Sequence, residues 1–288
     1  MQSNVFSTNK TLNLRGRIMD LSIPKVMGIL NITPDSFYDG GRFLSVDQAV
    51  TKCGEMLEEG AEMIDVGGYS TRPGAIDVSE QEELDRVIPV IEKIVQHFPE
   101  TIISIDTFRS SVAKLAVSAG ASMVNDVSGG NLDGNMFPTV ASLGVPYILM
   151  HSRGTPQTMA SLTQYNNLLT DIAFDLSKKL NQLHSLGVKD IIIDPGFGFA
   201  KTIDQNFELL GNLGYFRILE KPLLIGLSRK SMIWKTLAIN SKEALNGTTT
   251  LNTIALIKGA SILRVHDVKE AVECVKLVSR TLQGQPNN

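Results

Sequence analysis

The sequence has few of the features that mark extracellular, membrane or nucleic-acid-binding proteins. Only two cysteines occur in 288 residues, Cys53 and Cys274, and they suggest neither a disulfide framework nor a metal site. No apolar run approaches the roughly 18 residues of a membrane span, and residues 1–15 contain no apolar signal-peptide core. A net charge of −3 argues against a protein that mainly binds nucleic acid or anionic membranes. We therefore expect a cytoplasmic protein that binds neither nucleic acid nor a membrane.

The sequence does contain a recurrent pattern, in which a short apolar run ends abruptly in a polar residue. This happens eight times, and most of the runs are rich in β-branched residues, as expected for strands buried on both faces. The strands expected from these runs are 25–30, 62–66, 101–106, 122–126, 145–150, 189–194, 222–226 and 260–265.

The segments between most of these strands have the 3.6-residue period of amphipathic helices. The expected helices include 46–60, 79–97, 110–119, 165–186 and 267–282. Alternating strands and helices indicate a parallel sheet, and eight units favour an α/β fold of the (β/α)8 TIM-barrel type. An open doubly wound sheet is the alternative, but no G-x-G-x-x-G follows an early strand. We expect a single domain over 1–288, a barrel over about 24–280, and a short hairpin within 11–24 at the bottom of the barrel.

The polar residues that end the strands predict an active site, because the carboxyl ends of barrel strands meet at one mouth. Arg264 and His266 are two residues apart and therefore share a face, as expected for groups that bind a phosphate. The run 228–231 (Ser-Arg-Lys-Ser) follows the seventh strand, where barrels often bind phosphate. Asn125 and Asp126 are adjacent and must face opposite sides of their strand, and the pattern alone does not choose between them.

Seven segments of the chain resemble the dihydropteroate synthase family in both order and spacing. They cover nearly the whole chain between Pro24 and Arg280: ILNITPDSFYDGG (29–41), MIDVGGYSTRPGA (63–75), SIDTFRSSVA (104–113), VNDVSGG (124–130), IIDPGFGFAKT (192–202), LIGLSRKSMI (224–233) and ILRVHDV (262–268). The resemblance implies an enzyme that condenses 4-aminobenzoate with a pterin methyl diphosphate and releases diphosphate during folate synthesis. It also selects Asn125 rather than Asp126.

The resemblance implies a role for each matching residue. The pterin would be bound by Asp106, Asn125, Asp194, Lys230 and Arg264. The diphosphate would be bound by Asn31, Thr71, Arg72, Arg264 and His266. The 4-aminobenzoate would be bound by Phe37, Pro73, Phe199, Lys230 and Ser231. The residues expected to take part in catalysis are Arg72, Asp106, Asp194, Lys230, Arg264 and His266.

The resemblance further implies a Mg²⁺ cofactor held by Asn31, with diphosphate oxygens and water as its other ligands, and a homodimer. Two other readings are a methyltetrahydrofolate:corrinoid methyltransferase-like enzyme and a non-catalytic pterin-binding paralogue. Both are disfavoured by the residues expected at a diphosphate site. Tyr69 departs from the family, in which many members carry an acid. His151 and Lys201 lie close to the expected site, but the sequence assigns them no role.

Overall fold

A computed structural model describes residues 10–32, 45–70 and 77–283 of the chain. Eight parallel strands in the described residues form the barrel wall: β3 (Lys25–Asn31), β4 (Met63–Gly67), β5 (Ile102–Asp106), β6 (Met123–Asp126), β7 (Tyr147–Met150), β8 (Ile191–Asp194), β9 (Leu224–Ile225) and β10 (Ile262–Val265). The strands pair in chain order from β3 to β8, and β10 pairs with both β3 and β9. A parallel bridge between Ile193 and Leu223 connects β8 to the segment before β9 and closes the circle.

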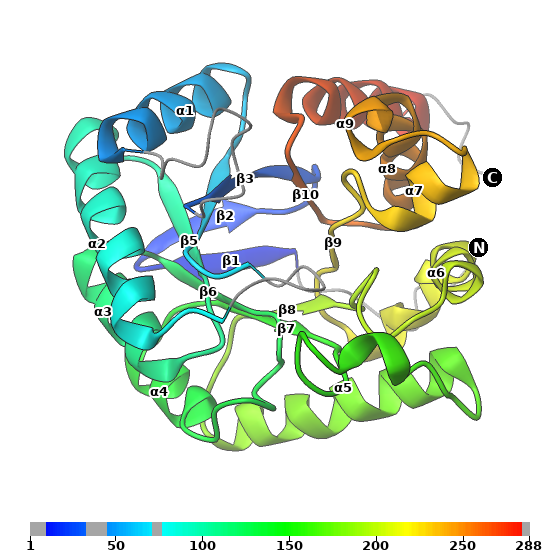
Figure 1. Cartoon of the computed structure of the whole chain (residues 1–288), viewed down its shortest axis with the longest axis horizontal. Helices are drawn as coiled ribbons and strands as arrows, with labels where there is room; N and C mark the ends of the chain where they lie inside the picture. Colours follow the sequence, from blue (N-terminus) through cyan, green and yellow to red (C-terminus); the bar gives the residue numbers. More distant parts are fainter. Residues whose placement is uncertain (1–9, 33–44, 71–76, 284–288) are drawn as a thin grey trace.

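The helices lie outside the strands, as Figure 1 shows. In chain order they are α1 (Val46–Glu58), α2 (Glu80–His97), α3 (Ser110–Ala119), α4 (Met136–Leu143), α5 (Leu168–Ser185), α6 (Ile203–Gly211), α7 (Ser231–Thr236), α8 (Leu245–Ile257) and α9 (Val268–Gln283). Short 3-10 turns occupy Met159–Ser161, Leu213–Leu219 and Ser241–Glu243. Ser45 and Ser79 begin α1 and α2 as N-caps, because each side chain accepts a hydrogen bond from the backbone three residues later.

The lower interior of the barrel is apolar and contains one side chain from each strand. These side chains are Met27, Met63, Ile102, Met123, Ile148, Ile192, Leu224 and Ile262. Leu12, Leu14 and Leu21 pack against them from the N-terminal hairpin of β1 (Thr11–Leu14) and β2 (Arg17–Asp20). The hairpin therefore covers the bottom of the barrel, as predicted, and the opposite end is left for the polar groups.

Close packing of helices on strands uses glycine at two positions that matter for the site. A Cβ at Gly28 of β3 would lie 2.8 Å from Met56 Sδ of α1. A Cβ at Gly68, just after β4, would lie 2.7 Å from Val87 of α2. Because neither position has room for a side chain, α1 and α2 can approach the strands that lead into the two long connections.

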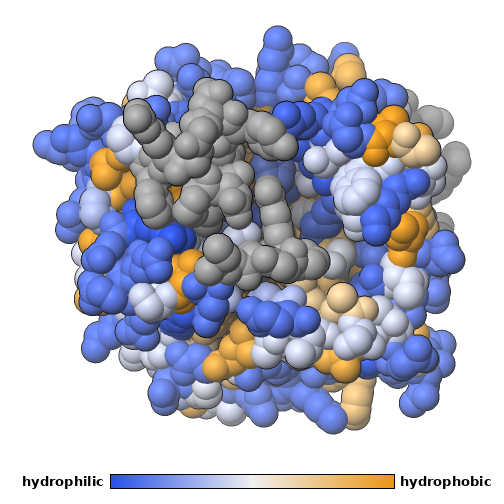
Figure 2. All heavy atoms as spheres, in the orientation of Figure 1, coloured by the Kyte–Doolittle hydropathy of each residue, from blue (hydrophilic) through white to orange (hydrophobic). Residues whose placement is uncertain are grey.

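The fold and most of the element boundaries predicted from the sequence are confirmed. All eight strands lie where they were expected, and α1, α2, α3, α5 and α9 match their predicted ranges to within a few residues. No helix in the described residues is long and apolar enough to cross a membrane. On the face drawn in Figure 2, the described surface is mainly hydrophilic, with hydrophobic residues scattered over it. A binding site on this face is therefore expected inside the mouth of the barrel rather than on an apolar surface.

Candidate active site

Four strand residues form one row across the upper end of the barrel. Asn31 pairs with Gly67, Gly67 with Asp106, and Asp106 with Asn125. Gly67 has no side chain between two polar neighbours, and a Cβ there would lie 3.4 Å from Asn31 Oδ1 and 3.7 Å from Asp106 Oδ2. The parallel register thus brings together three of the predicted site residues from three different strands.

Arg264 of β10 joins two carboxylates inside the barrel. Its Nε lies 2.5 Å from Asp65 Oδ2, and its Nη2 lies 2.6 Å from Asp106 Oδ2. The Arg264 and Asp106 side chains are 20% and 14% exposed, whereas Asp65 is fully buried. A charge-assisted network of this kind fixes the guanidinium group at the upper end of the barrel.

Asp65 is a site residue to which the sequence analysis gave no role. It is two residues before the end of β4, so it shares the inward face with Gly67. Besides Arg264, its Oδ2 accepts a hydrogen bond from Asn125 Nδ2 at 2.9 Å. The contact orients the Asn125 amide, and its carbonyl oxygen is left to act as an acceptor toward a ligand. The signal was visible in the sequence as the acid in the run EMI-Asp65-VGG.

Burial is the largest cause of the pKa shifts of the ionisable residues in the site. It raises the pKa of Asp106 to about 7, although the Arg264 guanidinium acts in the opposite direction. Burial also raises the pKa of Asp194, which Lys230 opposes. For Lys230, burial lowers the pKa to about 8, although Asp194 favours the charged form. The site therefore holds groups whose charge changes close to neutral pH, as is common where chemistry takes place.

The connection from β8 to α6 brings aromatic and cationic groups together. Asp194 ends β8, and its Oδ1 accepts a hydrogen bond from Gly196 N at 2.7 Å. Lys230 Nζ donates to the Phe197 carbonyl and lies 4.7 Å from the centre of the Phe199 ring. Half-buried Ser231 follows as the first residue of α7. Three residues predicted to surround 4-aminobenzoate are thus neighbours in space or in sequence.

The residues of the predicted phosphate-binding run 228–231 have different hydrogen-bond partners. Ser228 Oγ lies 3.0 Å from His266 Nδ1 and accepts a hydrogen bond from His266 N at 3.2 Å, so the ends of the β9 and β10 segments are joined. Arg229, by contrast, forms a bidentate pair with Asp267, at 3.0 Å and 2.6 Å. Of the two cations in this run, Lys230 therefore interacts with Asp194 of the site, whereas the guanidinium group of Arg229 is paired with Asp267.

Asp126 and His151, whose roles the sequence did not decide, are both buried. Asp126 is fully buried and accepts hydrogen bonds from Tyr147 Oη at 2.7 Å and from the amides of Ser128 and Gly130 at 2.8 Å. It is a structural acid on the opposite face of the strand from Asn125. His151 is 1% exposed, and its Nδ1 lies 3.2 Å from Lys201 Nζ.

Four of the predicted site residues, Phe37, Thr71, Arg72 and Pro73, lie outside the described residues. The stems of the second connection are described. Tyr69 Oη donates to Asp77 Oδ1 at 3.0 Å, and Arg109 donates to the Val78 carbonyl at 2.6 Å. The tyrosine at position 69, where many family members have an acid, therefore forms a hydrogen bond between the two ends of the segment that carries Thr71, Arg72 and Pro73.

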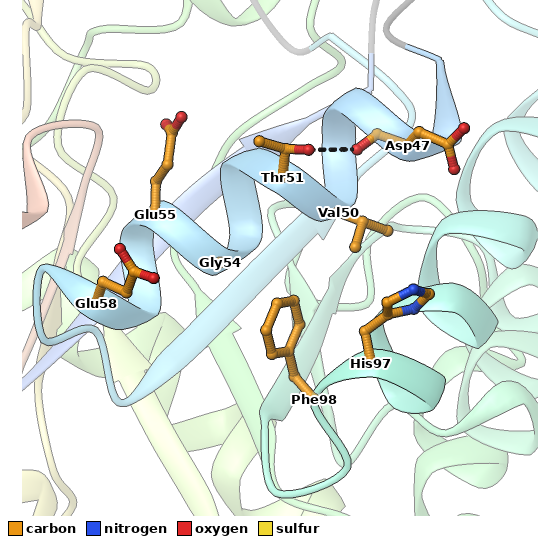
Figure 3. Close-up of a pocket in the computed structure, with 8 residues that line it drawn as sticks. All are labelled: Asp47, Val50, Thr51, Gly54, Glu55, Glu58, His97 and Phe98. Atoms are coloured by element: carbon orange, nitrogen blue, oxygen red, sulfur yellow. Dashed lines mark hydrogen bonds between the residues drawn. The ribbon is translucent and has the colours of Figure 1, made fainter.

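A hollow of about 400 Å³ lies far from this chemistry, on the outer ring of helices. Figure 3 shows its lining residues on α1 and at the end of α2, among them Glu55, Glu58 and His97. His97 is exposed, and its Nδ1 lies 2.9 Å from the Lys93 carbonyl. The polar groups in the barrel mouth remain the candidate active site.

Comparison with known proteins identifies the family of this chain. Residues 27–266 match the family described as pterin binding enzyme. The chain is 42% identical to dihydropteroate synthase from Escherichia coli K12 over 95% of this chain and 97% of that protein. A Yersinia pestis dihydropteroate synthase solved with a sulfonamide drug superposes with a TM-score of 0.90 at 42% identity, covering 95% of this chain and 100% of the other. A Xanthomonas albilineans dihydropteroate synthase in complex with 7,8-dihydropteroate gives 0.85 at 36% identity, with 96% and 100% covered.

Proposed function

This chain belongs to the dihydropteroate synthase family of pterin-binding enzymes and is a transferase of folate biosynthesis, and we propose the following roles for its residues in the reaction. The reaction condenses 4-aminobenzoate with (7,8-dihydropterin-6-yl)methyl diphosphate and yields 7,8-dihydropteroate and diphosphate. The observation that carries the assignment of residues is the joined set of Asp65, Asp106, Asn125 and Arg264 at the barrel mouth.

The pterin is bound by the polar strand ends. Its ring amide and exocyclic amine are donors, and Asp194 together with the Asn125 carbonyl oxygen supplies acceptors for them. Asp65 keeps the Asn125 amide in the orientation that this requires, because Asp65 already accepts from Nδ2. Arg264 and Lys230 complete the pocket, with Asp106 holding Arg264 in place.

Bond breaking at the pterin methylene produces charge of both signs. The carbon–oxygen bond to diphosphate breaks and its electron pair leaves with the diphosphate, whose charge Arg264, His266 and Arg72 stabilise. Asp106 and Asp194 stabilise the positive charge that the ring and methylene acquire. The nitrogen lone pair of 4-aminobenzoate then forms the new carbon–nitrogen bond, and the nitrogen releases a proton to solvent. Because an aniline is neutral at pH 7, no strong base is needed.

The second substrate lies between the β8–α6 connection and the start of α7. Phe199 supplies an aromatic face, while Lys230 and Ser231 supply donors for the carboxylate. Phe37 and Pro73 belong to the same pocket in this proposal, on the basis of the sequence resemblance.

The residues present fit a magnesium ion that arrives with the diphosphate. Asn31 Oδ1 is a hard oxygen donor beside Gly67, where a Cβ would narrow the space around it. No cluster of three His, Cys, Asp or Glu side chains suitable for a permanent metal occurs in the described part of the chain. When bound, Mg²⁺ would neutralise charge on the leaving diphosphate.

We also propose a cytoplasmic homodimer. Ile257 of α8 and Leu277 of α9 are 57% and 70% exposed, and the two helices are neighbours in the outer ring (Figure 1). The two free cysteines agree with a reducing compartment. Light scattering of wild type and of Leu277→Glu would test the dimer.

The assignment of residues is tested by following 7,8-dihydropteroate formation by chromatography. Asp106→Asn and Arg264→Ala are each expected to lower kcat/KM by about 100-fold or more, since each breaks the partly buried ion pair between Asp106 and Arg264. Near wild-type turnover in both variants would refute the proposed roles.

A further inference from the structure

A buried lysine to which no role has been assigned, Lys201, has a hydrogen-bond partner for each of its three ammonium protons. Lys201 is 9% exposed, and its Nζ donates to the Gly196 carbonyl at 2.8 Å and to the Phe199 carbonyl at 3.1 Å. His151 Nδ1 lies 3.2 Å away as a third partner. An ammonium group has three protons, so three acceptors satisfy it fully. A lysine is rarely buried to this extent without a specific partner.

The backbone held by Lys201 is the connection between β8 and α6. Gly198 N donates to Asn206 Oδ1 at 2.7 Å, and the Ala200 carbonyl accepts from Tyr165 Oη at 3.0 Å. Three residues of the connection, Gly196, Gly198 and Ala200, have positive φ angles of 77°, 79° and 50°. For a residue with a Cβ, such as Ala200, this conformation is unfavourable and persists only when surrounding contacts impose it.

Two lysines hold the connection through different carbonyls. Lys230, which is partly exposed, donates to the Phe197 carbonyl and faces the Phe199 ring. Lys201, which is buried, donates to the carbonyls of Gly196 and Phe199. A Cβ at Gly196 would lie 2.0 Å from the His151 carbonyl oxygen, so the end of β7 is in direct contact with the connection.

We propose that Lys201, held by His151, is a positioning residue that fixes the 195–200 connection so that Phe199 presents its ring to 4-aminobenzoate. Lys201 does not itself contact either substrate. The inference rests on the proposed placement of 4-aminobenzoate beside Phe199. It predicts a larger effect on the second substrate than on the pterin, because Phe199 lies in the connection itself, whereas the backbone of Asp194 is also held within the barrel by a hydrogen bond from His151 N to its carbonyl at 2.9 Å.

The electrostatics agree with a neutral imidazole facing the lysine. Burial lowers the pKa of Lys201 to about 7, and burial together with Lys201 lowers the pKa of His151 well below its usual value. His151 is therefore neutral at pH 7 and able to accept from Lys201.

The test is the substitution Lys201→Met, which keeps an unbranched side chain only one atom shorter and removes its donors. We expect the KM for 4-aminobenzoate to rise about tenfold, the equivalent of a lost charge-assisted hydrogen bond. The Kd for pterin methyl diphosphate, measured by calorimetry, and kcat at saturating 4-aminobenzoate should change by less than about twofold. Lys258→Met is the matched control, since Lys258 Nζ also donates to a backbone carbonyl, that of Gly211 at 2.8 Å, but on the outer ring.

A second pair of variants keeps the proposal testable if Lys201→Met fails to fold. His151→Gln retains an acceptor for Lys201 and should keep the wild-type KM, whereas His151→Leu should raise it. An unchanged KM in Lys201→Met, or an equal loss in pterin affinity and kcat, would overturn the positioning role while leaving the proposed function intact. Absence of dihydropteroate with the wild-type protein would overturn both.

Discussion

At the scale of single residues, the site depends on which acids face inward and what they hold. Asp106, Asn125 and Asp194 each stand near the end of an apolar run, and the family resemblance singled them out as pterin-binding residues. It gave Asp65 no role, because the contact of Asp65 with Arg264 joins residues 199 positions apart. No local pattern predicts such a contact. Likewise, the spacing placed Arg229 with Lys230, and only the tertiary structure shows the pairing of Arg229 with Asp267.

Asp65→Asn tests whether this buried acid prepares the pterin pocket. The substitution removes the charge that faces Arg264 and removes the constraint on the Asn125 amide. We expect kcat/KM for pterin methyl diphosphate to fall about 10- to 100-fold, corresponding to roughly 1.4–3 kcal/mol. Ser104→Ala is the control, because Ser104 faces Asp65 on the neighbouring strand and its hydroxyl has no hydrogen-bond partner among the described residues. Equal effects from the two substitutions would contradict the role of Asp65.

The shifted pKa values predict a narrow pH optimum. Asp106, with its pKa raised to about 7, gains a proton in acid and weakens its pairing with Arg264. Lys230, with its pKa lowered to about 8, loses its proton in alkali. The kcat/KM for the pterin substrate should therefore fall below about pH 7 and above about pH 8. Lys230→Arg should move the alkaline limb to higher pH, because arginine keeps its charge. An alkaline limb that stays in place would show that another group titrates.

At the scale of elements, the strands were the most predictable part of the molecule, because strands buried on both faces have continuous apolar sequences. The longer helices followed from their period and caps, as Ser79 at the start of α2 illustrates. The short helices α4, α6 and α7 were not delimited, since six to nine residues give too few turns for a period to be recognised. The contacts of the connections, such as Tyr69 with Asp77, depend on tertiary packing and have no periodic signal.

Gly68→Ala tests whether close packing of α2 on β4 supports the fold. The added Cβ would meet Val87 at 2.7 Å and the Glu83 carbonyl at 3.2 Å, and the helix would have to move outward. We expect the free energy of unfolding in urea to fall by about 1–3 kcal/mol. Gly211→Ala provides the comparison, because nothing lies within 4 Å of a Cβ at that position. A Gly68→Ala variant as stable as Gly211→Ala would show that α2 has room to move.

At the scale of the whole molecule, stability and chemistry occupy opposite ends of one barrel. The lower interior is filled by apolar side chains and covered by the hairpin, and the upper interior holds the acids, amides and cations. This division was predictable from the sequence, because the polar residues follow the apolar part of each strand. The way in which Leu12 and Leu14 fit against eight different strands was not predictable, since it depends on three-dimensional packing.

Leu12→Ala tests the separation of the two ends. Leu12 is fully buried under the barrel, so its truncation is expected to lower the free energy of unfolding by about 2–5 kcal/mol. The kcat/KM of the folded protein should stay within about twofold of wild type, because the site is at the other end of the strands. Ile18→Ala on the same hairpin should change neither quantity much, since Ile18 is 64% exposed. A large fall in kcat/KM for Leu12→Ala at a temperature where it is fully folded would contradict the separation.

The most direct test of the account is release of diphosphate from pterin methyl diphosphate, followed with and without 4-aminobenzoate and Mg²⁺. The account predicts release that requires Mg²⁺, together with formation of 7,8-dihydropteroate in equal amount when 4-aminobenzoate is present. Saturable binding of the pterin without any release of diphosphate would contradict it, and would indicate a pterin-binding protein with other chemistry or with none.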